Sequence, residues 1–250
     1  MNLETRLDDV RHEYLRRITS GNGHLLRQVE QYIAARNGKM LRPRIVLLAA
    51  ASLGEETLNS RRTLLMAVCV EMLHNASLLH DDVIDHSPTR RGLPSVNARW
   101  NNAVAVLVGD YHLAKIMELL DEAGDADATR LVNQTVKAMV EAELLQQQLA
   151  VDSCQLTEDS TTNRQLPTAN CQLPDKDTYL RIIDGKTSQL FATAAALGNP
   201  AYHDFGLHFG RLFQLRDDQA DGEATPWTTE LIEHETATLR TIKPSLDIQI

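Results

Sequence analysis

Apolar residues recur along most of the chain at spacings of three and four, which is the period of an amphipathic helix. No stretch alternates polar and apolar residues for long enough to indicate a sheet. Breaks rich in Gly, Asn and Pro separate the apolar runs. The pattern predicts an all-α protein with helices at about 3–19, 24–36, 44–53, 59–82, 103–120, 126–151, 178–197, 202–217 and 228–241.

The segment 59–82 is apolar on more than one side, as a helix buried among others would be. Cys69 lies in this run and is expected in the core. The segment 152–177 is polar and predicts a long surface loop, where the spacing of Cys154 and Cys171 leaves a disulfide open. With 250 residues, the chain is expected to form one domain covering 1–250.

Composition limits the possible partners. The net charge is -9 and there is no block of Lys and Arg, which argues against nucleic acid. An acidic protein that binds an anion needs local basic residues or metal ions. The charged amino-terminal stretch lacks an apolar secretory core, and no segment approaches the roughly 18 continuous apolar residues of a membrane span. We therefore expect a cytoplasmic protein without a membrane span.

Two acidic clusters with the same i, i+1, i+4 spacing each follow an apolar helix. The first comprises Asp81, Asp82 and Asp85, and the second Asp217, Asp218 and Asp221. Acids four apart share a helix face and repel each other unless a cation lies between them. Oxygen ligands suit Mg²⁺, which also takes phosphate oxygens. One cluster alone is as readily a solvated helix end, but two matching clusters indicate a metal site.

Basic residues stand near the first cluster and elsewhere along the chain. They are Arg90 and Arg91 in the loop 87–94, Lys39 and Arg42 in the segment 38–43, and Lys186 further on. Arg side chains suit bidentate phosphate contacts, and Lys supplies a point charge. Each alone is typical of a solvated surface, but acids for metal together with bases for phosphate indicate a diphosphate site.

Six blocks of the sequence, from about Gly38 to Asp221, resemble the trans-isoprenyl diphosphate synthases, or polyprenyl synthetases. The blocks are GKMLRP (38–43), EMLHNASLLHDDVIDHSPTRRG (71–92), VLVGDYHLAK (106–115), EAELLQ (141–146), YLRIIDGKTSQLF (179–191) and FQLRDDQAD (213–221). Their order and spacing are more specific than either acidic motif. The resemblance implies a single-domain helical bundle, isoprenoid synthase-like, with both acidic motifs facing a central cavity.

The resemblance also implies an activity. The protein would be a prenyltransferase that condenses isopentenyl diphosphate with an allylic diphosphate to make a longer all-trans prenyl diphosphate. The reaction would be an Mg²⁺-dependent ionisation, condensation and elimination. Family members usually form homodimers through helices, and the apolar segment 103–120 is a candidate contact.

The motif positions carry over residue by residue. The implied metal ligands are Asp81, Asp82, Asp85, Asp217, Asp218 and Asp221, with Asp81, Asp85 and Asp217 binding most directly. The implied contacts to the allylic diphosphate are Arg90, Lys186, Thr187 and Gln214. The implied contacts to isopentenyl diphosphate are Lys39, Arg42, His74 and Arg91. The catalytic group would be Asp81, Asp85, Arg90, Lys186 and Asp217.

Some features depart from the family pattern. Only 29 residues follow Asp221, which indicates a shortened carboxy-terminal part, and Ala142 stands where the family usually has Gly. The alternative is therefore a catalytically weak or regulatory subunit of a heteromeric synthase. Lys39, Arg42 and Arg91 argue against a terpene cyclase, which has no second diphosphate to hold.

Small residues also stand one turn before the first acidic motif. They are Ala76 and Ser77, and a bulky residue there would form a floor for the growing chain. We therefore expect a product longer than farnesyl diphosphate.

Overall fold

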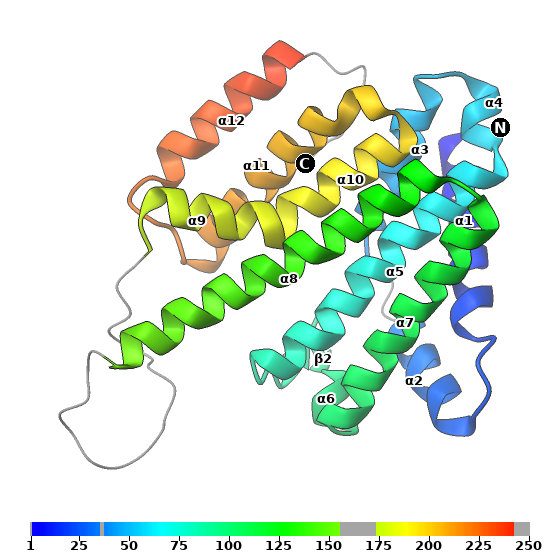
Figure 1. Ribbon diagram of the computed structural model, residues 1–250, viewed down its shortest axis with the longest axis horizontal. Coiled ribbons are helices and arrows are strands. Elements are labelled where there is room, and N and C mark those ends of the chain that lie inside the picture. Colours follow the sequence, from blue (N-terminus) through cyan, green and yellow to red (C-terminus); the bar gives the residue numbers. More distant parts are fainter. Residues whose placement is uncertain (1, 36–37, 156–173, 243–250) are drawn as a thin grey trace. The chain divides into compact units, whose positions relative to one another are not determined.

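The computed structural model describes residues 2–35, 38–155 and 174–242 and confirms an all-α protein (Figure 1). The helices are α1 (Leu3–Ile18), α2 (His24–Ala34), α3 (Leu41–Ala51), α4 (Glu55–Asn59), α5 (Arg61–Ile84), α6 (Val96–Arg99), α7 (Asn102–Ala123), α8 (Ala126–Gln155), α9 (Lys176–Ile183), α10 (Gln189–Gly198), α11 (His203–Asp221) and α12 (Thr228–Ile242). A π-helical segment, η1 (Asp184–Ser188), joins α9 to α10, and a 3₁₀ turn, η2 (Pro200–Tyr202), precedes α11.

A small hairpin occupies the predicted loop 87–94. Strands β1 (Thr89–Arg90) and β2 (Leu93–Pro94) pair antiparallel, with Arg90 opposite Leu93. The two residues between them, Arg91 and Gly92, have φ values of 54° and 75°. Positive φ at both central positions is what a type I′ turn requires. Strands of two residues are too short to show the alternation that predicts a sheet.

Contacts divide the chain into two compact units. The first unit comprises Met1–Arg130 with Ala194–Ala201, and the second comprises Leu131–Thr193 with Tyr202–Ile250. The three boundaries fall inside α8, α10 and the 3₁₀ turn η2. The expectation of a single domain over 1–250 stays a prediction.

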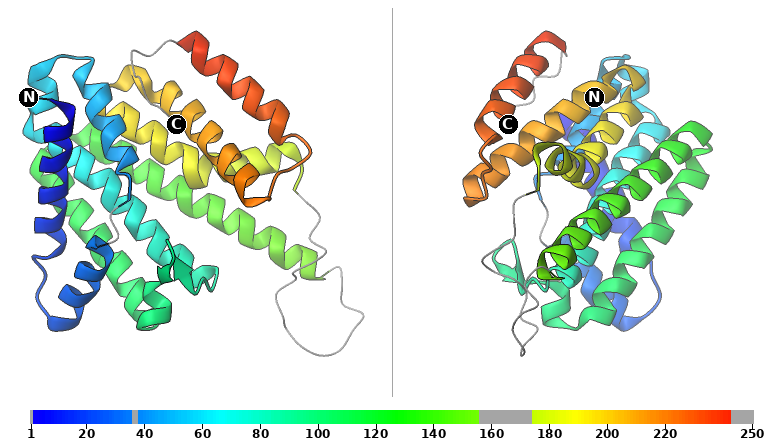
Figure 2. Two further views of the ribbon diagram at one scale, coloured as in Figure 1. Left: turned by 180° about the vertical axis from the view of Figure 1, so that it is seen from behind. Right: turned by 60° about the vertical axis from the view of Figure 1, so that its left-hand side comes forward.

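Helix α5 is the centre of the first unit, where it packs against α1, α3 and α7 (Figure 2). Apolar side chains on several of its faces, including Met66, Val68, Cys69 and Met72, have no exposed surface. This confirms the prediction of a core helix from the apolar run 59–82. Within the described residues, α5 is also the one helix long and apolar enough to cross a membrane. However, 72% of its most apolar window is buried inside the protein, as in a core helix.

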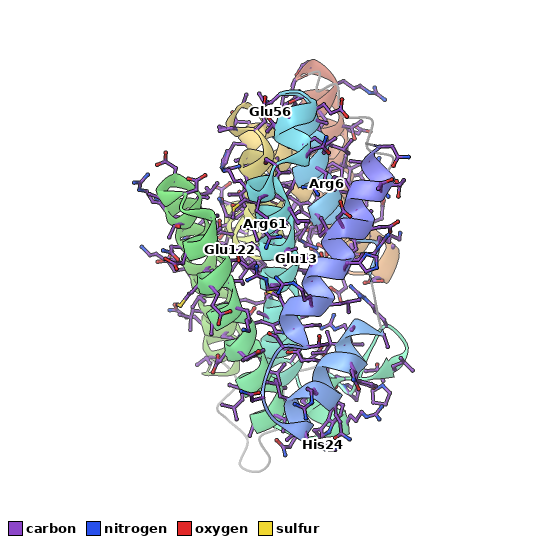
Figure 3. The ribbon with its side chains drawn as sticks, turned by 90° about the vertical axis from the view of Figure 1, so that its right-hand side faces the viewer. Arg6, Glu13, His24, Glu56, Arg61 and Glu122 are labelled. Carbon is purple, nitrogen blue, oxygen red and sulfur yellow. The ribbon has the colours of Figure 1, made fainter. Side chains whose placement is uncertain are left out.

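Charged side chains join α1 to its neighbours at the surface of the first unit. Glu13 of α1 accepts hydrogen bonds from Arg16 at 2.7 and 2.8 Å, from Arg17 at 3.0 Å and from Arg61 of α5 at 2.9 Å. Arg17 also pairs with Glu122 of α7. Arg61 pairs with the same carboxylate, and Figure 3 shows Arg61, Glu13 and Glu122 close together. The hydrogen bond from Arg16 is the largest cause that lowers the pKa of Glu13 to about 2. Three helices are thus joined by one ion-pair network.

In the second unit, α11 packs against α12 and η1. Its glycines allow close approach, because a Cβ on Gly206 would lie 2.5 Å from the carbonyl oxygen of Phe191. The rings of Phe191 and Phe209 meet edge to face at 5.3 Å. The glycine therefore lets the backbone of α11 approach that of Phe191, and the two rings pack next to this contact.

Several predicted boundaries were wrong. The predicted helix 178–197 is interrupted by η1, and the predicted helix 202–217 continues to Asp221, so the second acidic motif belongs to α11. Residues 152–155 extend α8, which shortens the predicted loop. At its other end, Lys176 and Asp177 already belong to α9. Residues 156–173 of that loop, Cys171 among them, lie outside the described residues.

Candidate functional site

Four predicted site residues form a cationic cluster in the first unit: Arg42 on α3, His74 on α5, and Arg90 and Arg91 on the hairpin. Burial lowers the pKa of His74 well below its usual range, and the charges of Arg42, Arg91 and Arg90 lower it further. Burial also lowers the pKa of Arg42 to about 10, against the opposing charge of Glu71. At neutral pH the cluster therefore holds charged guanidinium groups around a neutral imidazole.

The segment that carries Lys39 and Arg42 lies against Arg91. A Cβ on Gly38 would lie 2.7 Å from Nη2 of Arg91, so the guanidinium rests directly on the glycine backbone. Met40 and Arg91 both adopt left-handed backbone, with φ values of 51° and 54°. Such conformations are uncommon for residues other than glycine and cluster at binding sites. The structure thus brings Arg42, His74 and Arg91 together, with Lys39 exposed on the adjoining segment.

Asp82 of the first acidic motif is held inside the unit. It is 4% exposed and accepts hydrogen bonds from Nε and Nη2 of Arg90 at 2.9 and 2.5 Å. Asn97 supports the same turn by donating to the carbonyl oxygen of Asp82 at 2.9 Å. Asp82 and Arg90 also line a pocket of about 40 Å³, together with Ile33, Asn75, Leu78, Leu79, Arg91 and Val96.

Asp81 and Asp85 lie at the end of α5. The amide of Asp85 donates to the carbonyl oxygen of Asp81 at 2.8 Å, so the helical geometry that puts residues i and i+4 on one face reaches Asp85. Asp81 is half-buried and Asp85 is exposed. The two acids are therefore placed as the spacing predicted, while Asp82 turns towards Arg90.

The π-helical segment η1 carries two of the predicted residues of the second unit, Lys186 and Thr187. Nζ of Lys186 donates to Gln146 at 2.9 Å and pairs with Glu143 at 2.6 Å, both on α8. The two backbones are close, because a Cβ on Gly185 would lie 2.4 Å from Cβ of Ala142 and 2.8 Å from the carbonyl oxygen of Ala138. π-helical turns are rare and recur at functional sites.

A chain of hydrogen bonds links η1 to the second acidic motif. The hydroxyl of Thr187 donates to Oε1 of Gln214 at 2.7 Å, and Nε2 of Gln214 donates to Oδ1 of Asp218 at 2.7 Å. The hydroxyl of Tyr179 donates to Oδ2 of Asp218 at 2.5 Å. Three predicted site residues thus meet in one network, together with one tyrosine that was not predicted.

Asp217 and Asp221 are exposed at the end of α11. Partial desolvation, followed by the negative charges of Asp221 and Asp218, raises the pKa of Asp217. No group of three His, Cys, Asp or Glu side chains within the described residues could hold a metal ion by itself. The mutual repulsion of these carboxylates is what a cation would relieve, and an Mg²⁺ ion that takes its other ligands from water and phosphate fits such a set.

Sequence reasoning missed the residues that hold the predicted ones in place. They are Glu71 and Asn97 in the first unit, and Glu143, Gln146 and Tyr179 in the second. All but Asn97 lie inside the six blocks that carry the resemblance, and this position is the one feature of the sequence that could have indicated them. Asn97 follows the hairpin, three residues after Pro94, where the sequence gives no such indication.

The family model described as polyprenyl synthetase matches residues 23–232. The chain belongs to the polyprenyl synthetase family. Among curated family members, it is 38% identical over 206 residues to the all-trans-nonaprenyl-diphosphate synthase (geranyl-diphosphate specific) of Rhodobacter capsulatus, covering 79% of this chain and 57% of that protein. It is 33% identical over 213 residues to the octaprenyl diphosphate synthase of Escherichia coli, covering 80% and 59%. The matches thus span less than two thirds of these relatives.

Solved structures of the polyprenyl synthetase family share the fold. The polyprenyl synthase of Caulobacter crescentus, complexed with calcium and isoprenyl diphosphate, superposes with a TM-score of 0.70 at 30% identity, over 86% of this chain and 62% of that one. The decaprenyl diphosphate synthase of Rhodobacter capsulatus gives a TM-score of 0.74 at 28% identity, over 99% and 79%. These likenesses confirm the predicted isoprenoid synthase fold.

Proposed function

We propose that this protein is a prenyltransferase that condenses isopentenyl diphosphate with an allylic diphosphate to give a longer all-trans prenyl diphosphate. The observation that carries the proposal is the cationic cluster of Arg42, His74, Arg90 and Arg91. It lies beside the end of α5 that bears the first acidic motif. An overall charge of -9 would repel a diphosphate, so such a local concentration of guanidinium groups supports an anion-binding role. Membership of the polyprenyl synthetase family supports the substrate class.

Lys39, Arg42, His74 and Arg91 would hold the diphosphate of isopentenyl diphosphate. The guanidinium groups offer paired donors to phosphate oxygens, and Lys39 adds a point charge. His74, neutral at pH 7 because its pKa is lowered, would add a single hydrogen bond without further charge repulsion. Glu71, which also faces Arg42 and Arg91, would offset part of their mutual repulsion.

The acids fit an Mg²⁺ requirement. Asp81 and Asp85 of the first unit, and Asp217 with Asp221 of the second, would hold the ions, while Asp82 and Asp218 would support them through their present partners. Bound Mg²⁺ neutralises charge on the diphosphate of the allylic substrate and makes it a better leaving group. That the two motifs serve one substrate pair is what the resemblance implies, and it stays a prediction.

Arg90 and Lys186 would bind the allylic diphosphate, with Thr187 and Gln214 near Lys186. Both cations already have an acidic neighbour, Asp82 for Arg90 and Glu143 for Lys186. These partners hold the side chains in place before substrate binds, so less conformational entropy is lost on binding. Fixed cations stabilise the negative charge that develops when the allylic carbon–oxygen bond breaks.

The test is an assay of the purified chain with labelled isopentenyl diphosphate, an allylic primer and Mg²⁺. We expect label in prenyl products that are resolved by chain length, and no product when EDTA removes the metal. Absence of incorporation with geranyl, farnesyl and geranylgeranyl primers would overturn activity by this chain alone.

A second candidate is a weak or regulatory subunit of a heteromeric synthase. The chain is 31% identical over 227 residues to heptaprenyl diphosphate synthase component 2 of Bacillus subtilis, over 87% of this chain and 59% of that protein. Its name describes one component of an assembly. Activity that appears only when a partner protein is added would support this candidate. A homodimer in analytical ultracentrifugation, with full activity, would support the first, and a cytoplasmic location fits either.

A further inference from the structure

The carboxylate of Asp218 is held on both of its oxygens by neutral donors. Tyr179 donates to Oδ2 at 2.5 Å, and Gln214 donates to Oδ1 at 2.7 Å. Gln214 is itself oriented, because its Oε1 accepts the hydroxyl of Thr187 at 2.7 Å. An amide whose oxygen is occupied in this way must present its NH₂ group to Asp218. The position of Asp218 is therefore set from two sides.

The side chain of Tyr179 is itself held in place by packing, so its hydroxyl can hold the carboxylate of Asp218 in position. The residue is 9% exposed and packs with Ile183, Leu215 and Leu231, while the ring centroids of Tyr179 and Trp227 lie 6.4 Å apart at an interplanar angle of 60°. A side chain locked by packing holds its hydroxyl in one place. A phenol is protonated at neutral pH, so the hydroxyl is a donor there. Burial, followed by the hydrogen bond to Asp218, raises the pKa of Tyr179 further.

The other acids of the motif have different surroundings. Asp217 and Asp221 are four residues apart on α11, share one face and are exposed. Asp218 lies one residue further round the helix and points to Tyr179 on α9. The end of α11 thus presents two acids to solvent and keeps the third bound to the protein.

We propose that Tyr179 is a positioning residue of the second acidic motif. By holding Asp218, its hydroxyl fixes the last turn of α11 so that Asp217 and Asp221 are presented together to a divalent cation bound to diphosphate. This inference rests on the proposed function and adds a residue to it. Outer groups of this kind commonly change metal affinity by about tenfold or more when they are removed.

The test uses Tyr179→Phe, which keeps the ring and removes the hydroxyl. The readout is Mn²⁺ binding in the presence of inorganic pyrophosphate. Binding is measured from the electron paramagnetic resonance signal of the Mn²⁺ that stays unbound. We expect an affinity about tenfold weaker than in the wild type. The Mg²⁺ concentration for half-maximal activity should rise by a similar factor, while the KM for isopentenyl diphosphate should not change.

The matched control is Tyr111→Phe, which likewise removes a buried phenolic hydroxyl, but from α7 of the first unit and not from the second acidic motif. This control should bind Mn²⁺ like the wild type. If Tyr179→Phe lowers the Tm but leaves Mn²⁺ affinity intact, Tyr179 is only structural and the inference fails. An active wild type with unchanged affinity in the variant would sink the inference alone. A wild type that binds Mn²⁺ with pyrophosphate but forms no product would sink the proposed function alone.

Discussion

Asp82 and Asp218 are each the second of three acids in their motifs, yet different chemistry holds the two carboxylates. Asp82 is paired with the guanidinium of Arg90, whereas Asp218 accepts from the neutral groups of Tyr179 and Gln214. The first arrangement combines two opposite charges, and the second leaves the negative charge of Asp218 in place. Acids with the same i, i+1, i+4 spacing in the sequence therefore lie in two different electrostatic environments.

The glycines near the two motifs differ in a similar way. Gly38 of the first unit is crowded by the far end of the long Arg91 side chain. Gly185 of the second unit is crowded by Cβ of Ala142 and by the backbone of Ala138. The first unit thus positions its cations through adaptable charged side chains. The second positions Lys186 through backbone packing that has little room to adjust.

The largest expected effect on stability comes from neutralising Asp82. Asp82→Asn leaves Arg90 without its anionic partner in a site where Asp82 is 4% exposed, and should cost about 2–4 kcal/mol. Asp218→Asn loses only the charged component of its hydrogen bonds and should cost about 1–2 kcal/mol. Urea unfolding of both variants measures the difference, with exposed Asp221→Asn as the control at under about 0.5 kcal/mol. Equal losses at Asp82 and Asp218 would contradict the electrostatic distinction.

The glycine pair gives the next effect. Gly185→Ala must push η1 away from α8 and should cost about 1–3 kcal/mol, with a matching loss of activity because Lys186 moves with η1. Gly38→Ala needs only a rotamer change of Arg91, so stability should stay within about 0.5 kcal/mol while the KM for isopentenyl diphosphate rises. Thermal unfolding and steady-state kinetics on the same preparations test both. A larger stability loss in Gly38→Ala would reverse the comparison.

A smaller effect on stability is expected from Glu13, whose ion pairs join helices and involve no residue of the candidate site. Its pKa is about 2 in the folded protein, below the usual value of 4.5, so it stabilises the fold above about pH 4.5. That contribution is lost as the pH falls from 4.5 to about 2. Glu13→Gln should therefore cost about 1–2 kcal/mol at pH 7 and almost nothing at pH 2, in urea unfolding at both values. A cost independent of pH would show that packing, not charge, is lost.

The smallest effect on stability is expected at Ser77, which lies half-buried on α5 and donates to the carbonyl oxygen of His74 at 2.9 Å. Ser77→Phe adds a ring at a position that is not fully enclosed and should cost about 1 kcal/mol. It should also shorten the prenyl product, because the ring would form a floor for the growing chain. Chromatography of the products, with Ser77→Ala as the control, decides this. An unchanged length distribution would remove Ser77 from that role.

Much of the fold could be predicted from the sequence because helical periodicity is strong here. The apolar run 59–82 predicted α5 to within two residues at each end. The hairpin at Thr89–Pro94 was missed because two-residue strands carry no period. The π-helical segment was missed because a single extra residue per turn leaves the apolar pattern of 178–197 nearly unchanged.

The sequence predicted the residues of the candidate site better than the contacts between them. The order of the blocks indicated Arg42, His74 and Arg91, and the structure brings these three together. The pairing of Asp82 with Arg90 was not predictable, because the same spacing also puts the acid on a metal-facing turn. Tyr179 gave no signal of its own, since an aromatic residue at helical spacing is usually part of the core.

The π-helical segment has a consequence for how the second unit varies. A π turn is equivalent to one residue inserted into an α-helix, so deleting a residue within Asp184–Ser188 could restore regular helix without breaking the chain path. The π turn takes up the extra residue locally, so a deletion would leave the helices on either side in register and displace the residues of the turn itself. Lys186 would then no longer point to its partners on α8, while Tyr179 on α9 would keep its own. A one-residue deletion here should therefore leave a folded protein that has lost its activity. Gaps in this stretch should be rare among active relatives.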